Sequence, residues 1–291
     1  MKFFKLMLWF ISCTLFSQHA MSQSIPSMRV MTYNIRYENQ WDTGAISWAN
    51  RREFIASTIL FHKAEIIGMQ EVLHSQLMYF DSVLTDFTHV GIGREDGREK
   101  GEYAPIFFNK KLFEHLEDSI FWLSPTPDKV SKGWDAALER ICTWVWLKDK
   151  RNGKIFFVFN THFDHIGVQA REESAKLILH QMKRIAGNTP IILTGDFNTA
   201  ENTMSINVLT GRVKEKEFFL RDAMHASALP HHGSSKTFCG FDLKKGVIGD
   251  RIDYIFVSRH FTVLTHATLA DFKEDHFPSD HFPVFSEMKL E

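Results

Sequence analysis

The sequence has little cysteine, with only three cysteines among 291 residues. So few cysteines rule out a small scaffold held together by several disulfides. Cys13 lies in the N-terminal segment, which leaves Cys142 and Cys239 for the rest of the chain. We expect these two to be unpaired core cysteines, with a single bridge between them as the alternative in an oxidising compartment.

The sequence also lacks an excess of charge of either sign. Its 34 basic and 35 acidic residues give a formal net charge of −1. A protein with this balance has no whole-molecule field that attracts nucleic acid. The charge balance therefore disfavours a polynucleotide as partner.

A long apolar run is absent except at the N-terminus. Lys2 and Lys5 precede an apolar stretch over residues 6–16, which small and polar residues follow, as in a secretory signal peptide. The stretch is too short to be a comfortable membrane span, and no later run is longer or more apolar. We therefore expect residues 1–23 to be removed and the protein to be periplasmic or secreted. Cys13 raises the alternative of lipid attachment, but the preceding "FIS" is a poor match for a lipoprotein cleavage site.

Linkers, low-complexity tracts and repeats are missing as well, so residues 24–291 are expected to form one domain, and a monomer by default. What this part of the chain contains is a series of short segments rich in Ile, Val, Phe and Tyr that end in polar or turn residues, as β-strands do. These segments are 28–36, 65–72, 104–110, 143–149, 154–162, 190–198, 251–258 and 282–290.

Two segments have helical periodicity instead. Residues 47–64 carry Asn50 and Glu53 at a capping spacing, and residues 167–187 end in Gly187, a plausible C-cap. Because strands outnumber helices, a single parallel sheet fits less well than two packed sheets with helices outside. The pattern predicts a layered α/β sandwich.

Acidic, amide and imidazole residues recur at the ends of the strand segments. They are Asn34, Glu71, His162, Asp196, Asn198, Asp253, Asp280 and His281. One carboxylate at a strand end is most often a turn former or a helix cap. Its recurrence in six segments of one chain indicates a common site.

The composition of this set favours hydrolysis of a phosphate ester. That reaction needs a cation to neutralise phosphate and leaving-group oxygens, an acceptor for the attacking water, and donors for the phosphoryl oxygens. Glu71, Asp280 and Asn34 are oxygen ligands, which suit Mg²⁺ or Mn²⁺, whereas zinc favours several His or Cys ligands at compact spacing. We expect Mg²⁺, with Mn²⁺ as the alternative.

Six short strings occur in order across almost the whole of residues 24–291: "TYNIR", "QEV", "NTHFDH", "GDFN", "DRIDYIF" and "SDHFPV". Together they resemble the signature of the endonuclease/exonuclease/phosphatase superfamily, the DNase I-like fold. "GEYAPIFFNK" and "GWDAALERICTWV" further resemble an exported bacterial branch related to nocturnin-type hydrolases. The resemblance implies a four-layer αββα sandwich of two packed mixed β-sheets.

The resemblance also implies roles for the metal ligands and the catalytic residues. Glu71 would be the principal metal ligand, with Asn34 and Asp280 near the same cation. Asp196 would orient or deprotonate the attacking water, and Asn198 would hold that water or a phosphate oxygen.

Two histidines complete the implied machinery. His162 would donate to the phosphate or the leaving oxygen. His281 would contact the scissile phosphate, while Asp253 would bond its other ring nitrogen and favour the imidazolium. Family members differ in whether the aspartate or the histidine is the base; we favour Asp196.

Several further residues have two readings each. The resemblance places Arg36, Tyr103 and Arg140 near phosphate or the metal ligands, although many arginines only pair with surface carboxylates. Asp164 and His165 either line the substrate pocket or tie down the loop before the helix at Gly167.

Other segments have a functional and a structural reading. His231 and His232 form either a second metal site or, more simply, a solvated loop. The aromatics of "TWVWL" could stack on a base or sugar, but their β spacing favours the core. Residues 94–102 form a charged, glycine-rich loop that could border the site.

Three functions follow in order of preference. The first is a Mg²⁺-dependent phosphoesterase acting on phosphodiesters or phosphomonoesters of small molecules outside the cytoplasm. The second is a secreted nuclease with the same residues, which a basic groove would support. The third is a non-catalytic carbohydrate- or surface-binding protein, which has no need of Asp196, Asp253 and His281 together.

Overall fold

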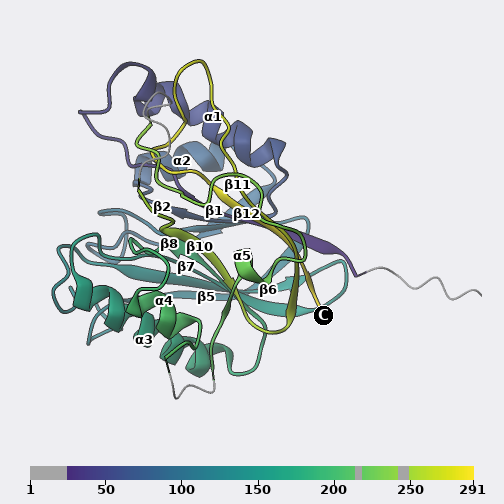
Figure 1. Cartoon of the computed structure of the whole chain (residues 1–291). Helices are drawn as coiled ribbons and strands as arrows, with labels where there is room; N and C mark the ends of the chain where they lie inside the picture. The colour runs from purple at the N-terminus through teal and green to yellow at the C-terminus, as the bar shows by residue number, and fades with distance from the viewer. Residues whose placement is uncertain (1–24, 214–217, 242–248) are drawn as a thin grey trace, which may run out of the picture.

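Two six-stranded sheets packed face to face form the body of the protein (Figure 1). The structure is a computed structural model that describes residues 25–213, 218–241 and 249–291. The expected signal peptide lies outside the described residues. Within the described part of the chain, no helix is long and apolar enough to cross a membrane.

The first sheet has the strand order β11-β12-β1-β2-β4-β3. In it β1 and β2 are parallel, and the other neighbours are antiparallel. Its strands are β1 (Ser27–Asn34), β2 (Ile66–Gln70), β3 (Phe87–Val90), β4 (Ile106–Asn109), β11 (Phe261–Thr268) and β12 (Val284–Leu290).

The second sheet has the order β5-β6-β7-β8-β10-β9. Here β7 and β8 are parallel, and the remaining pairs are antiparallel. Its strands are β5 (Phe113–Trp122), β6 (Ile141–Asp149), β7 (Ile155–His162), β8 (Ile191–Asp196), β9 (Arg221–Asp222) and β10 (Asp253–Val257). Both sheets are therefore mixed, as predicted.

Helices cover the outer faces of both sheets. Figure 1 shows α1 (Trp48–Phe61) and α2 (His74–Val83) above the first sheet, and α3 (Val168–Ala186) and α4 (Met204–Leu209) below the second. The short elements η1 (Gly44–Ile46) and α5 (Ala223–Ala226) complete the set. The four layers confirm the predicted αββα sandwich.

The cores follow from the period of two along each strand. Met28, Val30 and Ile66 point into the core between the sheets, whereas Met31 and Ile67 pack beneath α1 and α2. The second sheet divides in the same way between the central core and a core beneath α3 and α4. Strands buried on both faces therefore read as almost continuous apolar runs.

One helix start differs from the expectation. α1 has Ser47 at its N-cap, and the Asn50 side chain bonds the carbonyl of Gly44 instead of capping the helix. α3 ends as predicted, because Gly187 adopts a positive φ of 57° at its C-cap. Cys142 and Cys239 are both buried and free, which confirms the unpaired reading.

A single buried amide ties the two sheets together beneath one edge of the sandwich. Asn160 on β7 donates to the carbonyls of Met69 (2.7 Å) and Pro105 (3.0 Å) in the first sheet. Its oxygen accepts from Gln70 Nε2 (2.7 Å) and Thr194 Oγ1 (3.0 Å). All four hydrogen-bonding positions of the amide are thus used.

The sheets approach closely at this point. A Cβ on Gly68 would lie 2.1 Å from Thr194 Oγ1 and 2.5 Å from Asn160 Oδ1. Only glycine therefore fits in β2 opposite the Asn160 amide.

Replacing this amide should destabilise the protein. Asn160→Ala leaves buried carbonyls and a buried Gln70 amide without partners, so we expect the free energy of unfolding to fall by roughly 2–4 kcal/mol. Asn188→Ala, at an exposed turn, should change it by less than about 0.5 kcal/mol. Urea denaturation of both variants measures the difference; equal stability would contradict the role given to Asn160.

Candidate functional site

The predicted site residues meet at the edge of the sandwich just beyond Asn160. On the central strands the face between the sheets changes from apolar to polar toward this edge. The series are Val30-Thr32-Asn34, Ile66-Gly68-Gln70, Val158-Asn160-His162, Ile192-Thr194-Asp196 and Val257-Ile255-Asp253. The strand period that builds the central core therefore also directs these polar side chains toward one another.

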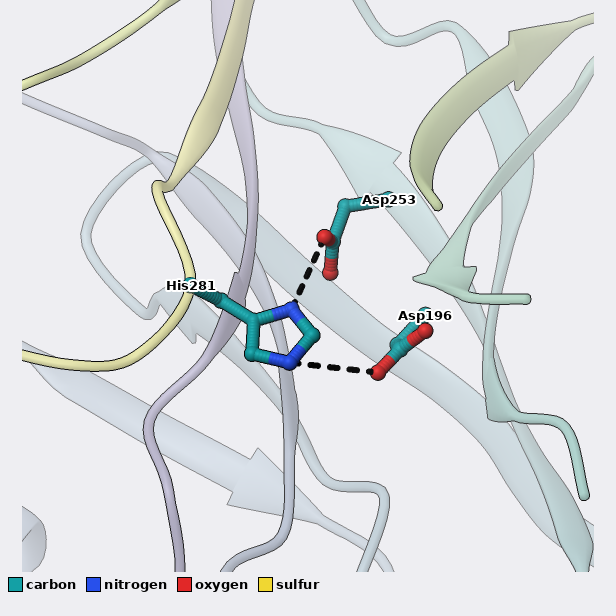
Figure 2. A group of neighbouring side chains, drawn as sticks. All are labelled: Asp196, Asp253 and His281. Carbon is teal, nitrogen blue, oxygen red and sulfur yellow. Dashed lines mark hydrogen bonds and ion pairs between the residues drawn. The ribbon is translucent and has the colours of Figure 1, made fainter. Parts of the chain in front are cut away.

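Asp196, Asp253 and His281 form a connected group in which His281 lies between the two aspartates (Figure 2). His281 Nδ1 lies 2.9 Å from Asp253 Oδ2, and Nε2 lies 3.8 Å from Asp196 Oδ2. Asp253 begins β10 rather than ending a strand as expected. It reaches this edge because β10 is antiparallel to β8, which pairs Asp253 with Asp196.

The charges of this group depend on one another. Burial disfavours the imidazolium, but the carboxylates of Asp253 and Asp196 outweigh it and raise the pKa of His281 well above its usual range. Burial, with the neighbouring charge of Asp253, raises the pKa of Asp196 to about 7. The two aspartates therefore favour the protonated form of His281, whose two ring nitrogens point at them, which fits the orienting role predicted for Asp253.

Asn34 connects the group to Glu71. Its Nδ2 lies 3.1 Å from Glu71 Oε1 and 3.0 Å from Asp196 Oδ2. Its Oδ1 accepts the backbone N–H of Arg36 at 3.0 Å, which fixes the orientation of the amide. The amide nitrogen thus faces the carboxylates, so Asn34 bridges them here instead of presenting the oxygen predicted as a metal ligand.

Backbone strain is concentrated at this edge. Arg36, Glu71 and Asn198 have φ values of 58°, 61° and 47°, in the left-handed region. Each such residue costs of the order of 1 kcal/mol or more and persists only where its surroundings hold it. Glu71 is held by the Asn34 amide and by the Tyr37 backbone N–H, which donates to Oε2 at 3.2 Å.

Asp280 lies beside this group in the loop before β12. Arg36 Nη1 is 3.9 Å from Asp280 Oδ2, so the predicted arginine does lie at the site. The Ser279 hydroxyl donates to the Asn34 carbonyl at 2.7 Å and anchors the loop. Burial raises the pKa of Asp280, and Glu71 adds to this, against the opposing charge of His281.

His162 lies on the other side of Asp196, with Nε2 3.5 Å from Asp196 Oδ2. Asn198 Nδ2 donates to the Phe163 carbonyl (3.0 Å), which fixes this amide, and lies 2.9 Å from His162 Nε2. Nε2 is therefore an acceptor, and the neutral ring carries its proton on Nδ1. In this arrangement His162 Nε2 holds Asn198. The donation from His162 to the phosphate or the leaving oxygen that the resemblance implied stays a prediction.

Sequence reasoning missed two residues behind His162. Glu102 Oε2 lies 3.7 Å from His162 Nδ1, and Arg94 pairs with Glu102 through two contacts of 2.8 and 2.9 Å. Burial, with the charges of Arg140 and Arg94, holds the pKa of His162 well below its usual range. Both residues belong to the charged loop 94–102, which indeed borders the site; only the position of the loop could have suggested them.

Asp164 anchors a loop. Oδ1 accepts the backbone N–H groups of Ile166 and Gly167, and Oδ2 accepts those of Ala137 and Leu138. These bonds favour the role of Asp164 in tying down the loop before the helix at Gly167 over the alternative that it lines the substrate pocket.

Arg140 and Tyr103 are the remaining candidates, and both contact residues of the loops around the site. Arg140 is buried beside Asp164 (3.5 Å) and His165 (3.0 Å). Tyr103 is buried, and its hydroxyl bonds Arg98 O (3.1 Å) and His74 Nδ1 (3.0 Å), which supports the loop over the site.

The histidine and aromatic segments follow their structural readings. His231 Nδ1 lies 2.9 Å from His266 Nδ1, and His231 Nε2 lies 2.9 Å from the Ser234 carbonyl. Trp144 of "TWVWL" belongs to the core beneath α3.

The donor set fits a divalent cation. Potential ligand atoms of Asp196, Asp253 and His281 lie within 4.8 Å of one another, and Asp253 Oδ1 is buried without a hydrogen-bond partner. A protonated His281 has no free lone pair for a metal, so the oxygen atoms of this edge are the ones that would hold a cation. The partly exposed Glu71 and the buried Asp280 add two further carboxyl groups, which leaves a surplus of acidic groups at this edge. A cation bound by oxygen ligands would neutralise it.

A second acidic group resembles this one only superficially. Glu201, Asp222 and His225 also lie together. Arg251 already pairs with Glu201 (2.9 Å) and Asp222 (3.1 Å), so the charge of this group is balanced by the protein itself.

Known proteins share both the sequence pattern and the fold. The profile of the Endonuclease/Exonuclease/phosphatase family matches residues 31–281. A solved structure described by that family name, from Bacteroides thetaiotaomicron, is 37% identical with a TM-score of 0.86; the match covers 92% of this chain and 99% of that one. A mannosyl-6-phosphatase from the same organism is 38% identical with a TM-score of 0.84, covering 90% and 100%.

A more distant similarity is to nocturnin of Drosophila melanogaster. It is 25% identical over 173 residues, which are 53% of this chain and only 24% of nocturnin. This chain therefore spans about a quarter of that relative's length.

The Asp164 anchor has a testable dependence on pH. Burial alone would raise the pKa of Asp164, but backbone N–H donors, that of Gly167 foremost, and Arg140 lower it to about 2. A depressed carboxyl pKa stabilises the fold above the unfolded value of about 3.9, and this contribution is lost as pH falls through about 2.

Asp164→Asn should therefore lower Tm at pH 7 by several degrees, at roughly 2–4 °C per kcal/mol. The difference from wild type should shrink between about pH 4 and pH 2. Thermal unfolding followed by circular dichroism at each pH measures it, with the exposed Asp128→Asn as control. If the difference in Tm between wild type and Asp164→Asn stays constant down to pH 2, the anchoring role of Asp164 is wrong.

Proposed function

Because the chain belongs to the endonuclease/exonuclease/phosphatase family, whose members are hydrolases of phosphate esters, we propose that it is a Mg²⁺-dependent phosphomonoesterase of a small sugar phosphate outside the cytoplasm. The protein is accordingly an enzyme acting on phosphate ester bonds. The observation that carries the finer proposal is the group of Figure 2, in which the buried His281 ring lies between the side chains of Asp196 and Asp253.

The residues of this group suit distinct steps of hydrolysis. Asp196 accepts a hydrogen bond from the attacking water and orients it, because its Oδ2 faces both histidines, 3.5 Å from His162 Nε2 and 3.8 Å from His281 Nε2. His281 is fixed by Asp253 and, as a cation, binds a phosphoryl oxygen through Nε2. Asn198 presents its amide oxygen to the same water, since its nitrogen is used by His162 and Phe163.

Glu71 and Asp280 are the proposed ligands of the cation, and the Asn34 amide sets the position of Glu71 relative to Asp196. When bound, Mg²⁺ would neutralise phosphate oxygens and the developing charge of the leaving group. Arg36 lies beside Asp280 and offers a guanidinium to the phosphate. Arg140, buried beside His165, is a second guanidinium near the same edge.

Two observations support a small phosphomonoester over a polynucleotide. The mannosyl-6-phosphatase is 38% identical along 90% of this chain. The net charge of −1 gives no general attraction for a polyanion.

The apolar N-terminal segment with Lys2 and Lys5 supports a substrate met outside the cytoplasm.

A panel of esters with purified protein tests this function. We expect Mg²⁺-dependent release of phosphate from hexose 6-phosphates that EDTA abolishes and added Mg²⁺ restores, with less activity on bis(p-nitrophenyl) phosphate, DNA and RNA. Activity confined to polynucleotides and steeply reduced by salt would make the protein a nuclease instead. Binding without turnover on every ester would make it a binding protein.

The role of Asp196 has its own variant. Asp196→Asn keeps the shape of the side chain but removes the charge that orients water, so we expect kcat to fall by roughly 10²–10⁴-fold with an unchanged circular dichroism spectrum. Asp275→Asn, whose carboxylate is 74% exposed, is the matched control and should retain wild-type kcat. Substantial hydrolysis by Asp196→Asn would exclude this role.

A further inference from the structure

The loop that joins β1 to η1 and α1 contains an exposed tryptophan. Trp41 is 71% exposed, among the most exposed large apolar side chains of the described residues. Tryptophan is highly buried on average, and an exposed indole offers a flat apolar face with one polar N–H to a ligand. No feature of the fold accounts for its identity.

The loop holds this tryptophan in a fixed turn. Asn39 Oδ1 accepts the backbone N–H groups of Trp41 (2.9 Å) and Asp42 (3.0 Å). Asn39 Nδ2 donates in turn to the Tyr37 carbonyl (3.2 Å) and to Asp42 Oδ2 (2.7 Å). One amide therefore uses both of its ends to close the turn around Trp41.

The same turn is bonded directly to the proposed phosphate site. Asp42 Oδ2 lies 3.1 Å from Arg36 Nε, and Arg36 Nη1 lies 3.9 Å from Asp280 Oδ2. The Arg36 backbone N–H also donates to Asn34 Oδ1 (3.0 Å). Trp41 therefore directly precedes Asp42, whose carboxylate contacts the Arg36 guanidinium at the proposed phosphate site.

The base of the loop is equally fixed. The buried Arg51 of α1 donates to the carbonyls of Ile35 and Arg36. On the returning side, Ser47 and Asn50 both bond the Gly44 carbonyl, at 2.9 and 2.8 Å. An exposed aromatic on a loop held at both ends loses little entropy when a ligand covers it.

We propose that Trp41 is the wall of a subsite that binds the sugar ring of the phosphomonoester whose phosphate lies at Arg36 and Asp280, an inference that rests on the proposed function. The apolar C–H face of a pyranose packs on an indole face, and burying both surfaces is favourable. The phosphate and the ring would then be bound by adjacent parts of one rigid loop.

The surroundings of Trp41 favour a sugar over a nucleic acid strand. Glu38 and Asp42 lie on the same turn, with carboxylate oxygens that suit hydrogen bonds from hydroxyl groups. The two carboxylates would repel further phosphates of a polynucleotide backbone. A neutral, hydroxyl-rich ring therefore fits better than a polyanion.

Steady-state kinetics of Trp41→Ala and Trp41→Phe test the subsite. The substrates are mannose 6-phosphate and the ringless ester glycerol 3-phosphate. For Trp41→Ala we expect kcat/KM on mannose 6-phosphate to fall roughly 5- to 10-fold, mainly through KM, the scale of one lost aromatic contact. The loss on glycerol 3-phosphate should be at most about 2-fold, and Trp41→Phe should restore most of the mannose 6-phosphate activity.

Phe61→Ala is the matched control, because Phe61 is 75% exposed but ends α1, about 20 Å along the helix from its first residue. It should behave as wild type on both esters. If the wild type is active and Trp41→Ala loses kcat/KM equally on both esters, or loses none, the subsite is overturned and the proposed function stands. A loss on adenosine 5′-monophosphate without one on mannose 6-phosphate would overturn the sugar assignment. Wild type inactive on every ester would overturn both proposals.

Discussion

The separation of the two sheets at the site edge depends on one buried amide, that of Asn160. Three of its four hydrogen bonds cross from β7 to β2 and to the segment before β4, and the fourth is to Thr194 on the neighbouring strand β8. Asn160 lies two residues before His162, and its partner Gln70 directly precedes Glu71. A buried amide that satisfies all its partners is rigid, because any displacement would leave polar groups unpaired in a low dielectric. The positions of the residues beyond it follow from that constraint.

At this edge the fold brings together more acidic groups than basic ones. Four carboxylates are brought together by strands whose apolar halves fill the central core, while the cations in contact with them are His281 and Arg36. Burial raises the pKa of Asp196 and of Asp280, so the isolated protein carries these groups at a cost in free energy. A divalent cation or a phosphate group bound at this edge would offset that cost, and its binding would then stabilise the edge.

The sequence predicted the layers and most of the edge because both arise from local patterns. Apolar strands ending in polar residues give the sandwich, and the order of the polar residues gives the site. Other parts depend on pairing that a local pattern does not contain. β5 was missed because "FEHLEDSIFW" is an exposed edge strand with polar residues along most of its length. Asp253 was placed at the wrong end of its strand, since only the antiparallel pairing of β10 with β8 reveals its direction. Glu102 and Arg94 became visible only once the loop 94–102 was seen to fold over His162.

The two free thiols have a consequence for where this chain can acquire its structure. Cys142 and Cys239 are buried in separate cores, and burial raises the pKa of both, that of Cys239 to about 12. Neither sulfur is therefore present as the thiolate that oxidants and alkylating reagents attack. The folded state depends on no bond between these two sulfurs, so a reducing host should yield the same fold as an oxidising one.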